Sequence, residues 1–246
     1  MTKQQGLSGQ AGGPLEALRQ LLREEAVLLA GLFGVTIMVI AFILFADEVL
    51  EGEFAAFDNR IIMALRAPGN LADPIGPAWL REMGRDITAL GSPLIIGLVL
   101  VTVVGYLLLV GKRSAALLMT GAVLGGAMLS TLLKTAFNRS RPDIPRVGDV
   151  LNASFPSGHT TLSAVAFLTI GILLMRVTPE PRLRVYFMTI AVLLSLMIGL
   201  SRIYLGVHFP TDVFAGWCVG GTWALLCSVV AWRLQRQGAI EAPGGA

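Results

Sequence analysis

Long apolar runs and short polar connections alternate along the chain. Six runs of 16 to 21 residues contain no charged side chain, and charged or turn-forming residues separate them. A helix needs about 20 apolar residues to cross roughly 30 Å of hydrocarbon. The pattern therefore predicts an all-α, polytopic membrane protein with six transmembrane helices. The expected helices cover residues 26–46, 93–110, 115–133, 160–175, 185–200 and 213–232.

Six transmembrane helices place both termini on one side of the membrane. Cytoplasmic loops are normally enriched in Lys and Arg. The side that carries the termini has ten of these residues, and the other side has nine. Three of the nine belong to the polar motifs described below, where chemistry rather than insertion accounts for them. The remaining balance of ten against six predicts that both termini are cytoplasmic.

Residues 47–92 form a connection that is too long for a simple turn and carries eight acidic side chains. Phe54, Phe57 and Ile61 recur at helical spacing, and a second series of this kind begins at Trp79. This periodicity predicts two amphipathic helices in the first outer loop. They would lie on the membrane or on the helix bundle, and a lid over an active site is the alternative.

The two ends of the chain lack this apolar periodicity. Residues 1–25 are expected to form a cytoplasmic tail that is disordered over about its first 13 residues, and residues 233–246 are expected to form a second disordered tail. Residues 26–232 would then form one membrane domain. The run at 26–46 is longer than the roughly 7 to 15 apolar residues of a signal-peptide core, so it is expected to be retained.

Composition supports a membrane protein and argues against other classes. Hydrophobic residues make up 54% of the chain and charged residues only 14%, against roughly a quarter in soluble domains. The net charge is +3, but no Lys/Arg cluster accompanies a nucleic-acid-binding fold. The two cysteines share one apolar run, which indicates neither a disulfide nor a zinc site. Gly121-x-x-x-Gly125 and Gly216-x-x-x-Gly220 indicate close helix packing.

Three polar segments lie at helix ends that this topology places on the same, outer face. Residues 134–142 follow the third helix, and residues 155–159 precede the fourth. Residues 201–212 join the fifth helix to the sixth. The predicted convergence of these segments on one face is the main chemical signal in the sequence.

The three segments contain groups that a phosphoryl transfer requires. Phosphate oxygens need cations and N–H donors to hold them. Lys134, Arg141 and Arg202 can supply the positive charges. Ser157 and Gly158 precede a helix, where a hydroxyl, free backbone N–H groups and the helix dipole all favour an anion.

The chain has only two histidines, and both lie in these segments. His208 and Asp212 are four residues apart around the start of the last helix. The carboxylate can therefore hold one imidazole N–H and leave the other nitrogen free to attack phosphorus. His159 is then the expected general acid for the leaving group and afterwards the base for water. These two roles predict a bell-shaped dependence of the rate on pH.

Each of these features has a simpler interpretation when taken alone. An arginine near a helix end is usually an interface anchor, and a Pro-Ser-Gly triplet is usually a turn. A histidine four residues from an aspartate is often only a structural pair. These interpretations do not account for three segments that share one face. The remaining polar residues are expected to be solvated loop charges, namely Arg139, Asp143, Arg146 and Asp149, with Tyr204 as an interface aromatic.

The three segments resemble the signature of the type 2 phosphatidic acid phosphatase (PAP2) superfamily, and the six-helix pattern around them is similar to its bacterial membrane-bound branch. The match consists of Lys134-x6-Arg141-Pro142, Pro156-Ser157-Gly158-His159 and Ser201-Arg202-x5-His208-x3-Asp212. The resemblance implies that His208 forms a phosphohistidine, with Asp212 as its partner and His159 as the acid. It also implies a phosphate site made of Lys134, Arg141, Ser157, Gly158 and Arg202. No cofactor or metal is expected.

The resemblance and the topology together favour a lipid phosphate as substrate. An outer site between helices suits a molecule whose head group stays in water while its tails stay in lipid. Undecaprenyl diphosphate is favoured, because its recycling requires dephosphorylation on the outer face, and phosphatidylglycerophosphate and phosphatidic acid follow. A lipid phosphotransferase with the same site and a non-catalytic protein that binds or transports anionic lipids remain alternatives. The protein is expected in the inner membrane with its site facing the periplasm or exterior, and the sequence does not indicate an oligomeric state.

Overall fold

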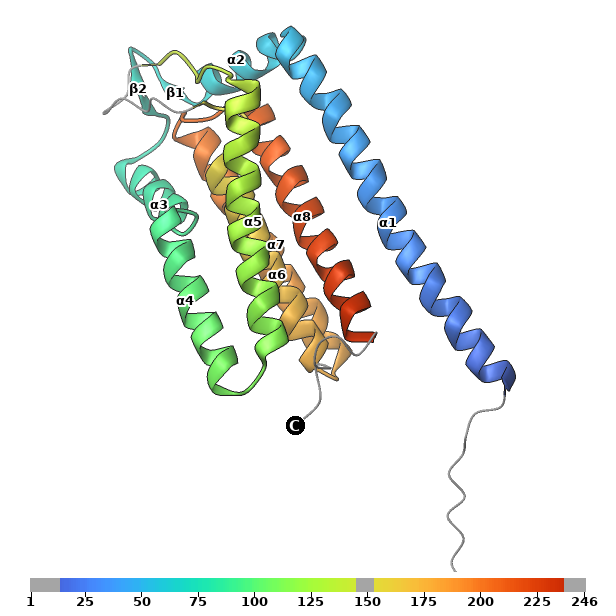
Figure 1. The fold of residues 1–246 in the computed structure, drawn as a ribbon. Helices are drawn as coiled ribbons and strands as arrows, with labels where there is room; N and C mark the ends of the chain where they lie inside the picture. The colour runs from blue at the N-terminus through green and yellow to red at the C-terminus, as the bar shows by residue number, and fades with distance from the viewer. Residues whose placement is uncertain (1–13, 145–152, 237–246) are drawn as a thin grey trace, which may run out of the picture.

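The computed structural model describes residues 14–144 and 153–236. These residues form a bundle of long helices with a layer of short elements across one end (Figure 1). In chain order the elements are α1 (Pro14–Glu51), α2 (Ala55–Ala64), β1 (Arg66–Ala67), β2 (Asn70–Pro74), α3 (Ala78–Ala89), α4 (Pro93–Leu109), α5 (Arg113–Phe137), α6 (Gly158–Val177), α7 (Pro181–Tyr204) and α8 (Pro210–Arg236). The predicted all-α class is confirmed.

Five of the six predicted apolar runs fall within long helices, and the run 93–110 exceeds α4 only by Val110. Among the described residues, five helices are long and apolar enough to cross a membrane, namely α1, α5, α6, α7 and α8. Helices α3 and α4 form a sixth candidate together, with a bend of 48° between them. Of the disorder predicted at residues 1–13 and 233–246, the segments 1–13 and 237–246 lie outside the described residues, whereas residues 233–236 are helical as the end of α8. Helices α1 and α8 extend beyond the predicted runs, since α1 begins at Pro14 and α8 continues to Arg236.

The long helices run alternately up and down the bundle. As a result, the C-terminal ends of α1, α5 and α7 lie at the same end as the N-terminal ends of α6 and α8 (Figure 1). The helix ends that carry the three polar segments therefore meet, as the sequence predicted. We call this the site end of the bundle, and it is the end that α2, β1 and β2 cover (Figure 1).

Helix α6 packs against α5, α7 and α8 and connects them. Gly216 and Gly220 allow α8 to approach α6 closely. A Cβ at Gly220 would lie 2.7 Å from both Thr161 O and Ala164 Cβ. Gly125 faces a tryptophan of α8, whereas a Cβ at Gly121 would meet no atom within 4 Å. The prediction of close packing therefore holds for one glycine motif and for half of the other.

The acidic connection contains both predicted amphipathic helices, α2 and α3, and a hairpin that was not predicted. Strands β1 and β2 pair antiparallel, with Arg66 opposite Pro74. The buried Arg66 side chain donates from Nη2 to the Tyr204 carbonyl at the end of α7. The Tyr204 hydroxyl donates in turn to the Ile75 carbonyl at 2.8 Å. Two hydrogen bonds thus attach the hairpin to the site end. Tyr204, which was predicted to be an interface aromatic, therefore also has a structural role.

Candidate active site

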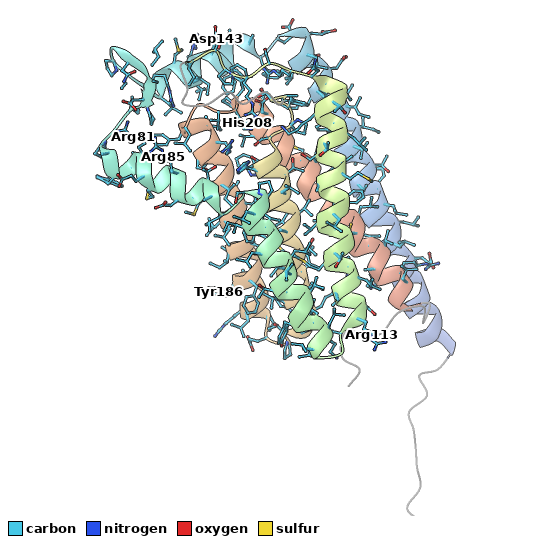
Figure 2. All side chains as sticks on the ribbon, turned by 60° about the vertical axis from the view of Figure 1, so that its left-hand side comes forward. Arg81, Arg85, Arg113, Asp143, Tyr186 and His208 are labelled. Atoms are coloured by element: carbon cyan, nitrogen blue, oxygen red, sulfur yellow. The ribbon has the colours of Figure 1, made fainter. Side chains whose placement is uncertain are left out.

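His208 lies inside the site end, whereas Arg113 lies at the opposite end of the bundle (Figure 2). His208 belongs to the short turn between α7 and α8, and this turn needs a glycine. Gly206 has φ = +70°, a conformation that side chains with a Cβ disfavour. A Cβ at Gly206 would also overlap the Ile144 side chain and lie 3.0 Å from Arg66 Nη1. The turn that places His208 in the interior therefore requires a glycine at position 206.

Asp212 holds the Nδ1 side of the His208 ring. The His208 Nδ1 atom lies 3.5 Å from Asp212 Oδ2. Ser154 links the two groups, since its Oγ lies 3.3 Å from Nδ1 and donates to Oδ2. The Phe209 N–H also donates to Oδ2 at 2.9 Å, as carboxylates in a first helical turn commonly accept from the residue before the helix. The His208 and Asp212 side chains are only 2% and 0% exposed, so this geometry is fixed by packing.

Arg141 contacts the other ring nitrogen and thereby identifies the tautomer. Arg141 Nη1 lies 3.2 Å from His208 Nε2 and donates to the Val207 carbonyl at 2.7 Å. A guanidinium only donates hydrogen bonds, so Nε2 must accept and the ring proton must lie on Nδ1. Burial lowers the pKa of His208 to about 3 against the opposing effect of Asp212, and the charges of Arg202 and Arg141 lower it further. His208 is therefore a neutral imidazole at physiological pH.

Lys134 and Arg202 join Arg141 in a group of three cations at the site. Lys134 lies in the last turn of α5 and donates to the Ala153 carbonyl at 2.7 Å. Arg202 lies near the end of α7 and donates from Nη1 to Thr88 Oγ1 of α3 at 3.0 Å. The charges of Arg141 and Arg202 both act on Lys134, which indicates that the three side chains lie near one another. Such a concentration of positive charge suits an anion.

The start of α6 faces these cations. Ser157 is the buried residue before the helix, and its N–H donates to the Asp212 carbonyl at 2.9 Å. Its Oγ accepts from Thr160 Oγ1 at 2.9 Å, which leaves the Ser157 hydroxyl proton for another acceptor. A Cβ at Gly158 would lie 3.3 Å from Lys134 Cε, so a glycine here brings the helix start close to the lysine. First-turn N–H groups have no intrahelical partner and favour an anion at this position.

His159 is the second residue of α6 and is half-buried. The positive charges of Arg202, Lys134 and Arg141 all act on its side chain. The bend between α3 and α4 lies against it, since a Cβ at Gly91 would be 3.2 Å from the His159 carbonyl oxygen and 3.5 Å from its Cβ. The structure thus gathers all eight predicted site residues at one end of the bundle.

The prediction that Arg139 is a solvated loop charge is wrong. Only 14% of its side chain is exposed, and it bridges two buried carboxylates. Its Nη1 lies 2.6 Å from Asp212 Oδ1, and its Nη2 lies 2.8 Å from Asp58 Oδ2. The guanidinium also lies over the Phe209 ring, 4.6 Å from the ring centroid. Arg139 is buried because its two carboxylate partners compensate the cost of taking its charge out of water.

Sequence reasoning misses Ser154 and Arg139, which contact the His208–Asp212 pair, and Asp58, which contacts Arg139. Ser154 lies beside one of the three polar segments and Arg139 lies within another, so only their position in the sequence could have indicated a role in the site. Asp58 is one of eight acidic residues in the connection 47–92, and its spacing does not distinguish it from the others. Asp143 is exposed, as predicted, while Arg146 and Asp149 lie outside the described residues.

The described side chains favour phosphoryl chemistry over metal binding. Within residues 14–144 and 153–236, no group of three or more His, Cys, Asp or Glu side chains is arranged to hold a metal ion. The site instead combines a neutral imidazole, three cations, a helix N-terminus and a second histidine. Together these groups can hold an anionic group beside a nucleophilic nitrogen and supply a proton to a leaving atom.

Known proteins resemble this chain over most of its length. The model of the PAP2 superfamily matches residues 115–236. Phosphatidylglycerophosphatase B of Bacillus subtilis (strain 168) is 32% identical over 170 residues, which cover 68% of this chain and 82% of that protein. The lipid A 1-phosphatase of Rhizobium etli is 32% identical over 188 residues, which cover 64% of this chain and 75% of that one.

A solved structure also matches the fold. It is the crystal structure of a transmembrane PAP2-type phosphatidylglycerolphosphate phosphatase from Bacillus subtilis. The TM-score is 0.74 at 27% sequence identity, and the match covers 82% of this chain and 98% of the other. The chain therefore belongs to the PAP2 superfamily, and the predicted class of enzyme, a membrane phosphatase, is confirmed.

Proposed function

We propose that this protein hydrolyses a phosphomonoester or diphosphate of a membrane lipid through a phosphohistidine on His208. The observation that carries the proposal is the asymmetry of the His208 ring. Nδ1 is held by Ser154 and Asp212, whereas Nε2 faces Arg141, 3.2 Å away. A neutral imidazole with its unprotonated nitrogen directed at a cation is prepared to attack a phosphate that the cation holds.

The first step transfers the phosphoryl group to the enzyme. Lys134, Arg141 and Arg202 hold the nonbridging oxygens, together with the N–H groups at the start of α6. His208 Nε2 attacks phosphorus, and the ester P–O bond breaks with its electron pair on the leaving oxygen. A protonated His159 gives its proton to that oxygen. Asp212 stabilises the positive charge that develops on the His208 ring.

The second step releases inorganic phosphate and restores the enzyme. His159, now neutral, takes a proton from water while the water oxygen attacks phosphorus. The P–N bond breaks and its electron pair returns to His208 Nε2. Inorganic phosphate leaves, and His159 is protonated for the next turnover. No cofactor or metal ion takes part in either step.

The substrate that we favour is undecaprenyl diphosphate, followed by phosphatidylglycerophosphate and phosphatidic acid. Two observations support a lipid phosphate. The site lies at the end of a bundle of apolar helices, where a lipid head group would meet the cations, and the similar proteins are named as phosphatases of lipid A and of phosphatidylglycerophosphate. We further propose that the site faces the periplasm or exterior of the inner membrane. Residues 26–232 would form the membrane domain between cytoplasmic tails at 1–25 and 233–246.

The direct test is release of inorganic phosphate by purified protein in detergent with EDTA, using the three candidate lipids. We expect release without metal, and a loss of several orders of magnitude for His208→Ala. Thermal unfolding of the variant should confirm that it is folded. Full activity in His208→Ala would contradict the mechanism. Phosphate transfer that occurs only with an added alcohol acceptor would favour a phosphotransferase, and lipid binding without any release would favour a transport or binding protein.

A further inference from the structure

Asp58 and Arg139 extend the His208–Asp212 pair into a longer chain of buried charges. Neither residue belongs to the match with the PAP2 signature. Asp58 comes from α2, in the connection 47–92, and Arg139 follows the end of α5. The chain runs from Asp58 to Arg139, then to Asp212 and on to His208. Three segments that are far apart in sequence thus meet behind the nucleophile.

The bonds in this chain leave little freedom to its central guanidinium. Arg139 donates to Asp212 Oδ1 at 2.6 Å and to Asp58 Oδ2 at 2.8 Å. Its Nη1 also donates to Thr211 Oγ1 at 2.8 Å. Thr211 in turn donates to Asp58 from its Oγ1 at 2.5 Å and from its N–H at 3.2 Å. Each member therefore has a defined orientation, and Asp58 contacts the catalytic pair only through Arg139 and Thr211.

The balance of charges among Asp58, Arg139 and Asp212 affects His208. Asp58 and Asp212 are fully buried, so solvent screens their charges poorly. Two carboxylates surround one guanidinium, and the three groups together carry one net negative charge. Without Asp58, the charge of Arg139 would be compensated by Asp212 alone. Little negative charge would then remain for the imidazole.

The cations near His208 make the negative charge of Asp212 necessary. The positive charges of Arg202 and Arg141 act on His208, and that of Lys134 acts on Asp212. Phosphoryl transfer adds positive charge to the ring in an environment that is already cationic. A carboxylate that is wholly neutralised by Arg139 would stabilise that state poorly.

We propose that Asp58 is a positioning residue that, through Arg139, keeps Asp212 negatively charged toward His208 during phosphoryl transfer. The proposal rests on the proposed function. It assigns a catalytic role to α2. If the contacts of Asp58 and Arg139 only held α2 against α8, changing either residue would lower stability. Charge compensation predicts instead that removing both charges gives a higher kcat than removing that of Asp58 alone.

The test compares Asp58→Asn, Arg139→Gln and the double variant D58N/R139Q in the full-length protein. The rate of phosphate release from phosphatidic acid micelles gives kcat and KM, and thermal unfolding is measured in parallel. We expect Asp58→Asn to lower kcat about tenfold, the effect of roughly one pKa unit at the nucleophile, with KM changed by less than about twofold. The double variant should recover most of the lost kcat, because Arg139, the cation that would otherwise neutralise Asp212, is also removed.

Asp73 and Arg81 provide a matched control. They form an ion pair in the same connection, but their side chains are 42% and 32% exposed. Asp73→Asn should therefore leave kcat unchanged. If Asp58→Asn does not fold, Arg139→Lys and Arg139→Gln are compared instead. Gln leaves Asp58 and Asp212 as two buried like charges with no cation between them, whereas Lys keeps the charge balance of the chain and should exceed Arg139→Gln in kcat by about fivefold.

Two results would overturn the inference. One is a kcat for Asp58→Asn within about twofold of the wild-type value, and the other is a double variant that is no faster than Asp58→Asn. In the replacement test, equal kcat values for Arg139→Lys and Arg139→Gln would also overturn the inference. His208→Ala is measured alongside, because activity in that variant would overturn the proposed function itself, whereas its inactivity would confine a negative result to Asp58.

Discussion

His208 lies between a carboxylate on one ring nitrogen and a guanidinium on the other. Asp212 and Ser154 hold the Nδ1 side, and Arg141 reaches Nε2. Because Arg141 cannot accept a hydrogen bond, its position decides which nitrogen is unprotonated. Burial with neighbouring cations keeps the ring neutral. The residue that we propose as nucleophile is thus prepared by its environment before any substrate binds.

The pKa of His208 predicts that the folded protein loses stability in acid. Its pKa is lowered from 6.5 to about 3 by burial, so between these values the unfolded chain binds more protons than the folded one. The contribution of His208 to stability is complete above about pH 6.5 and declines as the pH falls toward 3. The Tm in detergent should therefore fall more for the wild-type protein than for His208→Gln when the pH is lowered from about 7 to 4.5. An equal fall in both proteins would contradict this assignment.

The same pKa refines the predicted bell-shaped rate profile. An acid limb due to His208 should lie near pH 3, far below the value of 6.5 for a free imidazole. We therefore expect kcat/KM to show no decline attributable to His208 between about pH 5 and 7. An acid limb with its midpoint near pH 6.5 that persists in a His159 variant would contradict the lowered pKa of His208.

Residue types and their spacing were sufficient to predict that the eight candidate residues gather at one end of the bundle, because each type has few functions at a helix end. They were not sufficient for Arg139. Whether a loop arginine is solvated depends on which carboxylates the fold brings to it, and Asp58 is more than 80 residues away in sequence. Ser154 was missed for a related reason, since a serine in a loop has no distinctive chemistry until its neighbours are known.

At the scale of elements, the bend between α3 and α4 is the feature with the most direct effect on the site. Thr88 near the end of α3 accepts a hydrogen bond from Arg202. Gly91, within the bend, lies against the backbone of His159 and the side chain of Ile198. The bend therefore supports a proposed phosphate ligand and the proposed general acid at once.

Gly91→Ala should disturb this support. The added Cβ would lie 2.6 Å from Ile198 Cγ2 and 3.2 Å from the His159 carbonyl oxygen, and Ile198 is fully buried. Overpacking of this kind typically costs about 1–3 kcal/mol. We expect a lower Tm and a fall in kcat/KM of about tenfold. Gly97→Ala, within α4, is the control, because its Cβ would meet nothing within 4 Å, and it should leave both quantities unchanged. Equal behaviour of the two variants would show that the bend does not support the site.

The apolar runs predicted the long helices well, because a run that must cross hydrocarbon has few other structures available. The short elements were harder to predict. The β1–β2 hairpin has strands of two and five residues without a clear alternation of apolar and polar positions. The hairpin is held instead by tertiary bonds from Arg66 and Tyr204. The bend between α3 and α4 was also missed, since the two helices were expected to be separate.

At the scale of the whole molecule, the site end and the opposite end differ in their chemistry. Arg81, Arg85 and His208 lie toward one end, and Arg113 lies at the other (Figure 2). We propose that the site end faces outward, on the basis of the Lys and Arg distribution. This orientation would give the enzyme access to lipid phosphates of the outer leaflet.

Cysteine labelling in intact cells tests the orientation. A membrane-impermeant maleimide should react with Asn70→Cys in the exposed hairpin, and it should react with Arg113→Cys only after the cells are permeabilised. The native Cys218 and Cys227 are replaced by serine beforehand. They lie within the membrane-crossing part of α8 and are only partly exposed. The reverse labelling pattern would place the site on the cytoplasmic side and exclude an outer-leaflet substrate, without affecting the proposed chemistry.

The most direct test of the central claim is to trap the phosphorylated enzyme and locate the phosphoryl group. Enzyme is mixed with lipid substrate carrying ³²P in the scissile phosphate, and the reaction is stopped with alkali, because a phosphohistidine is stable in base and labile in acid. The mechanism predicts base-stable label on the peptide that contains His208, and none in His208→Ala. Label on another residue, or phosphate release by His208→Ala at the wild-type rate, would contradict it.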